Sequence, residues 1–202
     1  MTALLVLLAA GPPVSGQQQT APQPVERVAS IGTHSLRARV QGDGPPAVVV
    51  DVGIAGRTDE WQELQEALSL VASVVLYDRA GYGESEPGPL PRDSGREADE
   101  LNALLDSLDV PTPFVLVGHS LGGLNAQVYA SQYPEDVAGI VLLDPPPLAW
   151  VLGDSYPELR EVAERMTVEW QGIADGGATS SDPEDRTRSD FFNAIASEHR
   201  EM

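Results

Sequence analysis

The chain has 202 residues, of which 42% are hydrophobic, and this suits one globular domain with a substantial core. Its formal net charge of -19 disfavours nucleic acid and anionic membrane surfaces as partners, because both attract cations. The absence of cysteine excludes disulfides, thiolate catalysis and Cys-ligated zinc.

The first segment resembles a secretory signal. An apolar run, Ala3–Ala10, is followed by Pro12, Pro13 and small residues, which predicts a signal peptide over residues 1–16 with cleavage after Gly16. The run is too short to span a bilayer, and it differs from ordinary signals because no Lys or Arg precedes it. We therefore expect a secreted or periplasmic protein, with a cytoplasmic one as the alternative, and a linker over residues 17–24.

The next part of the chain predicts alternating strands and helices. Apolar and polar residues alternate over Val25–Ser30 and Ser35–Gln41, which indicates an antiparallel hairpin around Gly32. Buried strands are predicted at Ala47–Val50 and Ser73–Tyr77. Between them, a helix from about Trp61 to Leu70 follows a cap at Thr58 or Asp59, with Leu64, Ala67 and Leu68 on its buried stripe.

The same alternation continues after the loop Asp78–Ser85. Helical spacing of leucines from about Gly95 to Leu108 is followed by a strand at Phe114–Val117, a helix to about Tyr133 and a strand at Val137–Leu143. The predicted fold is α/β, with a doubly wound, mostly parallel sheet and an antiparallel N-terminal hairpin, over residues 25–147. Residues 148–202 predict a partial cap, helical over Leu148–Trp170, polar and loop-like over Gly172–Arg188, and ending in a short helix at Asp190–Ala196.

The segment Gly118-His119-Ser120-Leu121-Gly122 stands between a predicted strand and a predicted helix. A G-x-S-x-G sequence in this context is typical of a nucleophile elbow, a sharp turn that needs small residues two before and two after the serine. Such a turn places the serine hydroxyl at a helix N-terminus, where the next backbone N–H can face a developing oxyanion.

Together with two earlier turns, this segment resembles the α/β-hydrolase superfamily in its serine hydrolase branch, over Val25–Pro147. The earlier turns are Gly53–Gly56 after the third strand, with Trp61 downstream, and Asp78-Arg79-Ala80-Gly81-Tyr82-Gly83-Glu84-Ser85 after the fourth. The chain departs from many relatives by having Val52-Gly53, preceded by Asp51, in place of His-Gly before the first turn.

The resemblance implies roles for individual residues. Ser120 would be the nucleophile, the backbone N–H groups of Ile54 and Leu121 would form the oxyanion hole, and Gly118 and Gly122 would serve the elbow geometry. The implied substrate is a small molecule with an acyl group, and no cofactor or metal motif is present.

Several residues near these motifs favour structural roles. His119 belongs to the elbow pattern, because neighbours in a tight turn point in different directions and its ring does not easily reach the Ser120 hydroxyl. Asp78 and Arg79 are expected to shape their loop through an ion pair or backbone hydrogen bonds, and Trp61 to lie in the core. Tyr82 has two open interpretations, a pocket wall or an exposed loop aromatic.

The general base and its orienting acid are not evident. A serine nucleophile needs both, and in this fold they follow the nucleophile in the order acid, then histidine. The histidines are His34, His119 and His199, none of which has the expected position. Asp144 ends the last predicted strand, where some relatives carry the acid, although such a residue more often turns the chain into the cap. We therefore expect a C-terminally incomplete, impaired hydrolase that exposes a sheet edge and is poorly soluble or partly unfolded despite its charge.

Three functions are compatible with these motifs. The first is a serine hydrolase that cleaves a carboxylic ester or similar acyl substrate through a Ser120 acyl-enzyme. The second is a non-catalytic protein of this fold that binds a ligand or partner. The third is other chemistry on the fold, such as cofactor-free peroxidation, C–C hydrolysis or lactone opening. Ser120 argues against the dehalogenase and epoxide-hydrolase branches, which use aspartate at that position.

Overall fold

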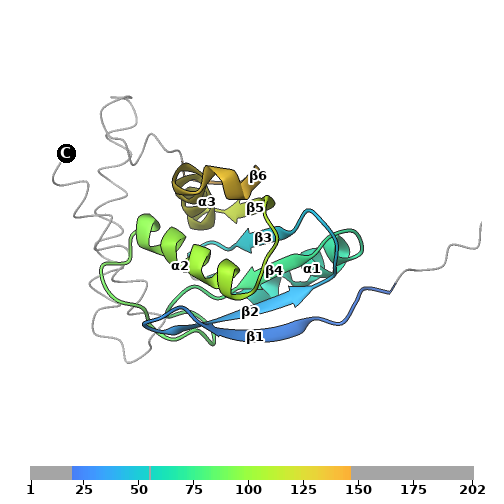
Figure 1. Cartoon of the computed structure of the whole chain (residues 1–202), viewed down its shortest axis with the longest axis horizontal. Coiled ribbons are helices and arrows are strands. Elements are labelled where there is room, and N and C mark those ends of the chain that lie inside the picture. Colours follow the sequence, from blue (N-terminus) through green and yellow to red (C-terminus); the bar gives the residue numbers. More distant parts are fainter. Residues whose placement is uncertain (1–19, 55, 147–202) are drawn as a thin grey trace, which may run out of the picture.

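The computed structural model describes residues 20–54 and 56–146. They form one mixed sheet of six strands in the order β1-β2-β4-β3-β5-β6 (Figure 1). The strands are β1 (Val25–Ser30), β2 (Ser35–Gln41), β3 (Val48–Asp51), β4 (Val74–Tyr77), β5 (Phe114–His119) and β6 (Val137–Leu143). The pairs β1–β2 and β2–β4 are antiparallel, and the others are parallel. This confirms the predicted fold, including the leading hairpin.

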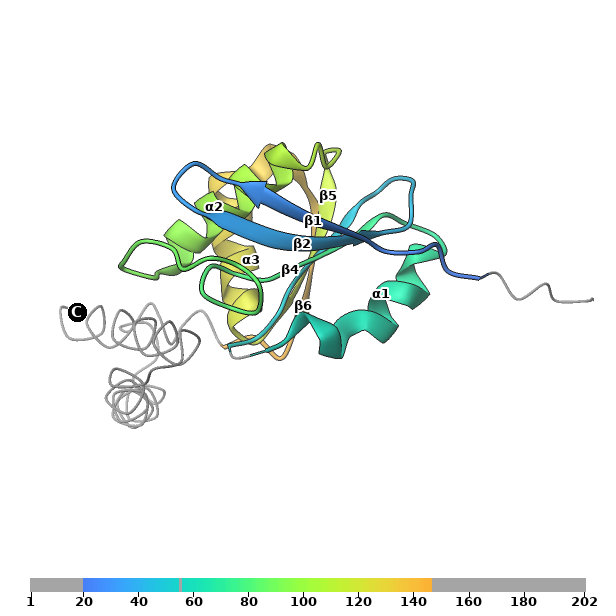
Figure 2. The ribbon, with the colours of Figure 1, turned by 90° about the horizontal axis from the view of Figure 1, so that it is seen from below.

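The helices cover both faces of the sheet. They are α1 (Gln62–Ser69), which a 3-10 turn (Thr58–Trp61) precedes, α2 (Ser94–Ser107) and α3 (Leu121–Gln132), which a 3-10 turn (Pro134–Asp136) follows. Figure 2 shows α2 and α3 on one face and α1 on the other. No helix within the described ranges is both long and apolar enough to cross a membrane.

The larger core cluster lies under α2 and α3. Leu101, Leu104 and Leu105 of α2 are buried against Phe114 and Leu116 of β5, as the leucine spacing predicts. The helix starts where Asp93 accepts a hydrogen bond from the Arg96 N–H, so a side-chain cap fixes its first turn. This packing holds β5, and therefore the turn that follows it, against the centre of the sheet.

Two expectations for α1 are wrong. Ala67 is exposed, and the helix instead buries Gln65 and Ser69. The Gln65 amide donates hydrogen bonds to the carbonyls of Arg39 and Val74, so a polar side chain occupies the buried face because it serves the strand backbone. The predicted cap is also absent, because neither the 3-10 turn nor α1 has a side-chain cap hydrogen bond. Thr58 is buried and bonds Asp78 instead.

The last strand in the sheet order, β6, is an edge strand with exposed apolar side chains. Ile140, Val141, Leu142 and Leu143 are each between 37% and 46% exposed. By contrast, every residue of β3 and β4 is buried. The signal peptide predicted over residues 1–16, residues 17–19 of the linker and the cap predicted over residues 148–202 lie outside the described residues.

Candidate active site

Ser120 lies between β5 and α3 in a backbone conformation that is rare for a residue with a side chain. Its φ is 50° and its ψ is -119°. Its N–H donates to the Leu143 carbonyl at 3.0 Å, which extends the β5–β6 ladder, and its own carbonyl accepts from the Gly123 N–H at 2.9 Å. The turn is thus fixed by the neighbouring strand on one side and by the first turn of α3 on the other.

Two close approaches require the glycines of this turn. A Cβ on Gly118 would lie 2.4 Å from the Gly122 carbonyl oxygen, and a Cβ on Gly122 would lie 2.1 Å from the Asp51 carbonyl oxygen. Carbon and oxygen atoms do not approach this closely without displacement of the backbone. The small residues therefore let α3 start directly against the end of β3.

That contact brings the Ser120 turn beside the turn after β3, which contains Ile54. A Cβ on Gly53 would lie 3.3 Å from the Ser120 Cβ. Ile54 is half-buried, whereas Leu121, the first residue of α3, is buried. The first N–H groups of a helix have no acceptor within the helix. The Leu121 N–H is one of these groups and can therefore donate to an acceptor outside α3.

Asp144 directly follows β6, at the carboxyl end of the parallel strands, where Ser120 also lies. It is exposed and has a left-handed backbone, with a φ of 47°. The residue before it, Leu143, pairs with His119 in the sheet register and accepts the Ser120 N–H. The fold therefore brings the backbones of Asp144 and Ser120 together, while Asp144's role as the acid stays a prediction.

The two described histidines have other neighbours. The His119 ring packs against the Trp61 ring, with centroids 5.5 Å apart, and its Nδ1 would lie 2.9 Å from a Cβ on Gly53. His34, in the β1–β2 turn, is buried between Thr33 and Glu100 of α2. Among the described residues, no side-chain hydrogen bond joins either histidine to Ser120. His199 lies outside the described residues.

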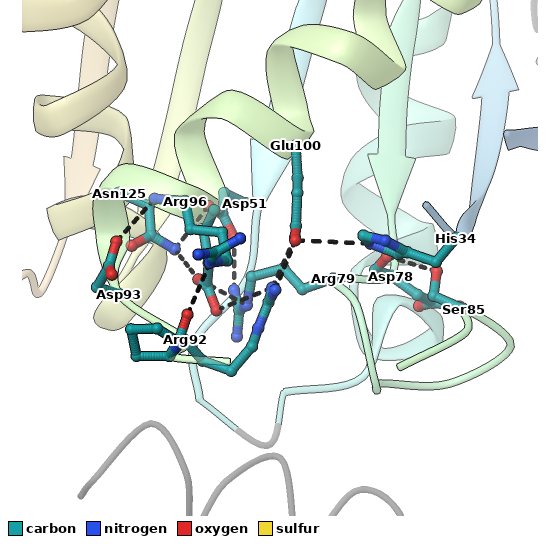
Figure 3. A network of polar contacts seen from close by, with 12 residues as sticks. His34, Asp51, Asp78, Arg79, Ser85, Arg92, Asp93, Arg96, Glu100 and Asn125 are labelled. Atoms are coloured by element: carbon teal, nitrogen blue, oxygen red, sulfur yellow. Dashed lines mark hydrogen bonds and ion pairs between the residues drawn. The ribbon is translucent and has the colours of Figure 1, made fainter. Parts of the chain in front are cut away.

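Behind the Ile54 turn lies a buried polar network that the sequence motifs do not identify. The Arg79 guanidinium, with a side chain 2% exposed, bonds the Asp51 carboxylate and the carbonyl oxygens of Val52 and Gly53. The Asn125 amide bonds both Asp51 and Glu97, at 3.2 Å and 2.6 Å. Figure 3 shows Arg79 directed towards Asp51, with Asn125 beside it.

The network continues along α2. Glu97 lies 3.5 Å from the Arg79 Nε and 3.7 Å from Arg92, and the Arg92 guanidinium forms a bidentate pair with Glu100. Glu100 in turn lies 3.5 Å from His34 (Figure 3). A signal existed in the sequence, since Asp51 ends an apolar strand and Arg79 follows another. Their pairing, however, joins two strand ends that are 28 residues apart, and local patterns do not report it.

The charges of this network shift the pKa values of its members. Burial lowers the pKa of Arg79, but the carboxylates of Asp51 and Glu97 outweigh burial, and the pKa is raised. Burial also raises the pKa of Glu97, and the neighbouring arginines offset this only in part. Arg79 is therefore a permanent cation in a region from which water is excluded.

The loop after β4 forms the wall of a cleft. Tyr82 is buried, with the Arg79 guanidinium 5.1 Å from its ring centre, so it is not an exposed aromatic. Asp78 accepts the Glu84 N–H, and the Arg79 carbonyl accepts the Tyr82 N–H at 2.9 Å, so both residues shape their loop as expected. The Arg79 guanidinium in addition bonds groups outside the loop. The cleft has a volume of about 400 Å³, and its wall includes Asp78, Tyr82, Thr58 and Arg37 but not Ser120. Among the described residues, no group of acidic or histidine side chains is arranged to hold a metal ion.

Comparison with known proteins identifies the family. Residues 46–160 match the family model described as the alpha/beta hydrolase fold. The (lyso)-N-acylphosphatidylethanolamine lipase of Mus musculus is 35% identical over 109 residues, which is 52% of this chain and 31% of the lipase. The candidate carbamate hydrolase RutD of Klebsiella pneumoniae is 38% identical over 103 residues, which is 50% of this chain and 38% of that protein. The chain thus spans well under half the length of these curated relatives.

Solved structures agree on the fold. Epoxide hydrolase A from Mycobacterium thermoresistibile superposes with a TM-score of 0.64 at 25% identity, over 77% of this chain and 52% of that one. Cfl2 from Burkholderia cenocepacia superposes with a TM-score of 0.62 at 18% identity, over 87% of this chain and 74% of that one. The match of the family model to more than half of the chain, on a sheet with this strand order, shows that the protein belongs to the alpha/beta hydrolase fold family.

Proposed function

We propose that the protein is a serine hydrolase that cleaves a carboxylic ester or a similar acyl substrate through an acyl-enzyme on Ser120. The observation that carries the proposal is the left-handed backbone of Ser120, φ 50°, at the start of α3. Backbone strain in a side-chain-bearing residue persists only where the surrounding structure enforces it, and it concentrates at functional sites.

The chemistry follows from what surrounds the serine. The hydroxyl attacks the substrate carbonyl, and the N–H groups of Leu121 and Ile54 stabilise the oxyanion that forms. The proton of the hydroxyl must pass to a general base. Among the described residues, His34 and His119 are not placed to accept it, because no hydrogen bond joins either ring to Ser120 and the rings contact Glu100 and Trp61 instead. We therefore expect slow turnover by the 202-residue chain and place the base outside the described residues.

The relatives support acyl chemistry over ring opening. The mouse relative is a lipase of an N-acylated phospholipid by its name. The structural neighbour that is an epoxide hydrolase shares the fold. That branch resembles this one but carries aspartate at the nucleophile position, where this chain has Ser120.

The test is covalent labelling of Ser120. A fluorophosphonate probe should modify the full chain at Ser120, and p-nitrophenyl esters should be hydrolysed slowly. Both activities should disappear in Ser120→Ala. Ser85→Ala is the matched control, because Ser85 is a buried serine that bonds the Asp78 carbonyl away from the elbow. Equal labelling and equal ester turnover in wild type and Ser120→Ala would refute the proposal.

A second candidate function is ligand binding without catalysis. It is favoured by one observation, that neither described histidine bonds Ser120. A protein of this kind would bind an acyl ligand, detectable by calorimetry, while its Ser120 would not react with the fluorophosphonate probe. The labelling experiment therefore separates the two functions.

A further inference from the structure

Arg79 holds the same peptide group that carries the predicted Ile54 oxyanion donor. Its Nη2 donates to the Gly53 carbonyl oxygen at 2.9 Å, and its Nη1 donates to the Val52 carbonyl oxygen. The Gly53 carbonyl and the Ile54 N–H belong to one planar trans peptide, in which the C=O and N–H bonds point in opposite directions. Fixing the oxygen towards Arg79 therefore directs the N–H away from Arg79.

The guanidinium is itself held rigidly. It pairs with Asp51 through Nη1 and lies 3.5 Å from Glu97 through Nε, while the Tyr82 ring stacks near its central carbon. Asn125 ties the two carboxylates together from α3. These partners come from β3, α2, α3 and the loop after β4, so the cation has little freedom to move away from the turn.

A buried cation on this carbonyl also changes the donor electronically. A hydrogen bond from a charged donor is stronger than one between neutral groups, and in a region of low dielectric it polarises the bonds next to it. Withdrawal of electron density through the amide makes the Ile54 N–H a stronger donor. The effect needs a flat group that reaches two carbonyls and two carboxylates at once, which a guanidinium does and a single ammonium does not.

We propose that Arg79 is a positioning residue that orients and polarises the Gly53–Ile54 peptide as an oxyanion donor. The catalytic part of this inference rests on the proposed function, because only an oxyanion formed at Ser120 would use the donor. The structural part, a Gly53 carbonyl oxygen held by Arg79 together with the Gly56 N–H at 3.1 Å, stands on the contacts alone. Asp51, Glu97 and Asn125 act one step further away by fixing Arg79.

The test compares Arg79→Lys with Arg92→Lys in the full chain. Arg92 is the matched control, because it is equally buried and lies in the same network but bonds Glu100 and does not contact the turn. Two readouts are taken on each protein: the chemical shift of the Ile54 amide proton by ¹H–¹⁵N NMR, and the rate at which the fluorophosphonate probe modifies Ser120. Thermal unfolding of each variant establishes that it is folded.

In Arg79→Lys we expect the Ile54 amide resonance to move upfield and the labelling rate to fall by roughly tenfold, part of the roughly 10²–10³-fold effect of removing one oxyanion donor. Arg92→Lys should change neither by a comparable amount. An unchanged Ile54 resonance in a folded Arg79→Lys protein would overturn the inference, as would equal losses in both variants.

The two proposals fail in different ways. If wild type is labelled no faster than Ser120→Ala, the serine hydrolase proposal is refuted. The Ile54 resonance still tests whether Arg79 orients the Gly53–Ile54 peptide. If Arg79→Lys does not fold, Asn125→Ala removes the amide that joins Asp51 and Glu97 while leaving Arg79 in place. The inference then requires a smaller upfield movement of the same resonance, and no movement would overturn it.

Discussion

At the scale of single residues, two side-chain-bearing residues with left-handed backbone stand at the carboxyl ends of neighbouring strands. Ser120 and Asp144 have φ values of 50° and 47°. Both conformations are unfavourable for residues with a Cβ. Both occur at the same end of the sheet, where the parallel strands finish. A sequence predicts such strain only through a motif, and G-x-S-x-G provides one for Ser120. No comparable motif marks Asp144.

Gly122 gives a prediction about the elbow itself. Gly122→Ala would place a Cβ 2.1 Å from the Asp51 carbonyl oxygen, so α3 must move away from β3. We expect a loss of roughly 1–3 kcal/mol in the free energy of unfolding, as for overpacked cores, and a strong reduction in Ser120 labelling. Urea denaturation and the fluorophosphonate probe measure the two effects.

Gly139→Ala is the matched control, since no atom of the described residues lies within 4 Å of a Cβ at that β6 position. It should stay within about 0.5 kcal/mol of wild type. If the two glycine variants unfold at the same urea concentration, the close approach of α3 to β3 does not exist in solution.

The sequence predicted the residues of the elbow because the constraint is local: both glycines lie two residues from Ser120. It did not predict that Arg79 acts on the Gly53 carbonyl. That contact depends on β3 and β4 being adjacent and in register, with Val50 opposite Leu76. Strand order is a property of the folded sheet. From the sequence alone, therefore, Arg79 is predicted only to be a loop residue, and its contact with the Gly53 carbonyl is not predicted.

At the scale of elements, Glu97 joins α2 to α3 through the Asn125 amide and to the loop after β4 through the Arg79 guanidinium. Burial raises its pKa above the ordinary value of 4.5. A carboxyl with a higher pKa in the folded chain binds protons more tightly there, so its contribution to stability is present below pH 4.5 and is lost as the pH rises through the folded pKa.

Glu97→Gln should therefore flatten the pH dependence of stability. As the pH rises above 4.5, the free energy of unfolding should decline less in the variant than in wild type, measured by urea denaturation at each pH. Glu63→Gln, on the exposed side of α1, measures the effect of removing one surface carboxyl. A steeper decline in Glu97→Gln than in wild type would show that the pKa of Glu97 is lowered instead.

The helices show where element-level prediction succeeds and fails. The leucine spacing of α2 reports the apolar part of its buried face correctly, because those leucines pack in the core, but it does not report that Glu97 is buried beside them. For α1 the apolar residues mislead, because Gln65 is buried to satisfy two strand carbonyls. Apolar periodicity contains no information about backbone groups on a neighbouring sheet that need a donor.

At the scale of the whole molecule, two features affect association between copies of the chain in opposite directions: the acidic net charge disfavours it, and the exposed apolar edge strand favours it. The net charge of -19 makes copies of the chain repel one another, whereas β6 is the last strand of the sheet that the described residues form, and it carries the exposed apolar side chains of Ile140–Leu143. Salt screens the repulsion but leaves the edge unchanged, so we expect association of the chain to increase with ionic strength.

Val141→Glu should reduce that association, because it places a charge in the middle of the edge. Val28→Glu is the control, since Val28 is 71% exposed on β1 at the opposite edge of the sheet. Light scattering over a salt series compares the three proteins. A wild-type chain that remains monomeric at every salt concentration would contradict the expectation, as would equal suppression by both variants.

The chain leaves the last described strand beside Ser120, the proposed nucleophile. Pro145 lies against the first turn of α3, where its Cβ would be 2.8 Å from a Cβ on Gly123, and Leu143 holds the Ser120 N–H. Residues 144–146 thus leave the sheet beside the Ser120 turn, held there by contacts with β5 and α3. Under the proposed function, we expect exchange of the sequence after Pro146 to change substrate choice more than the reactivity of Ser120.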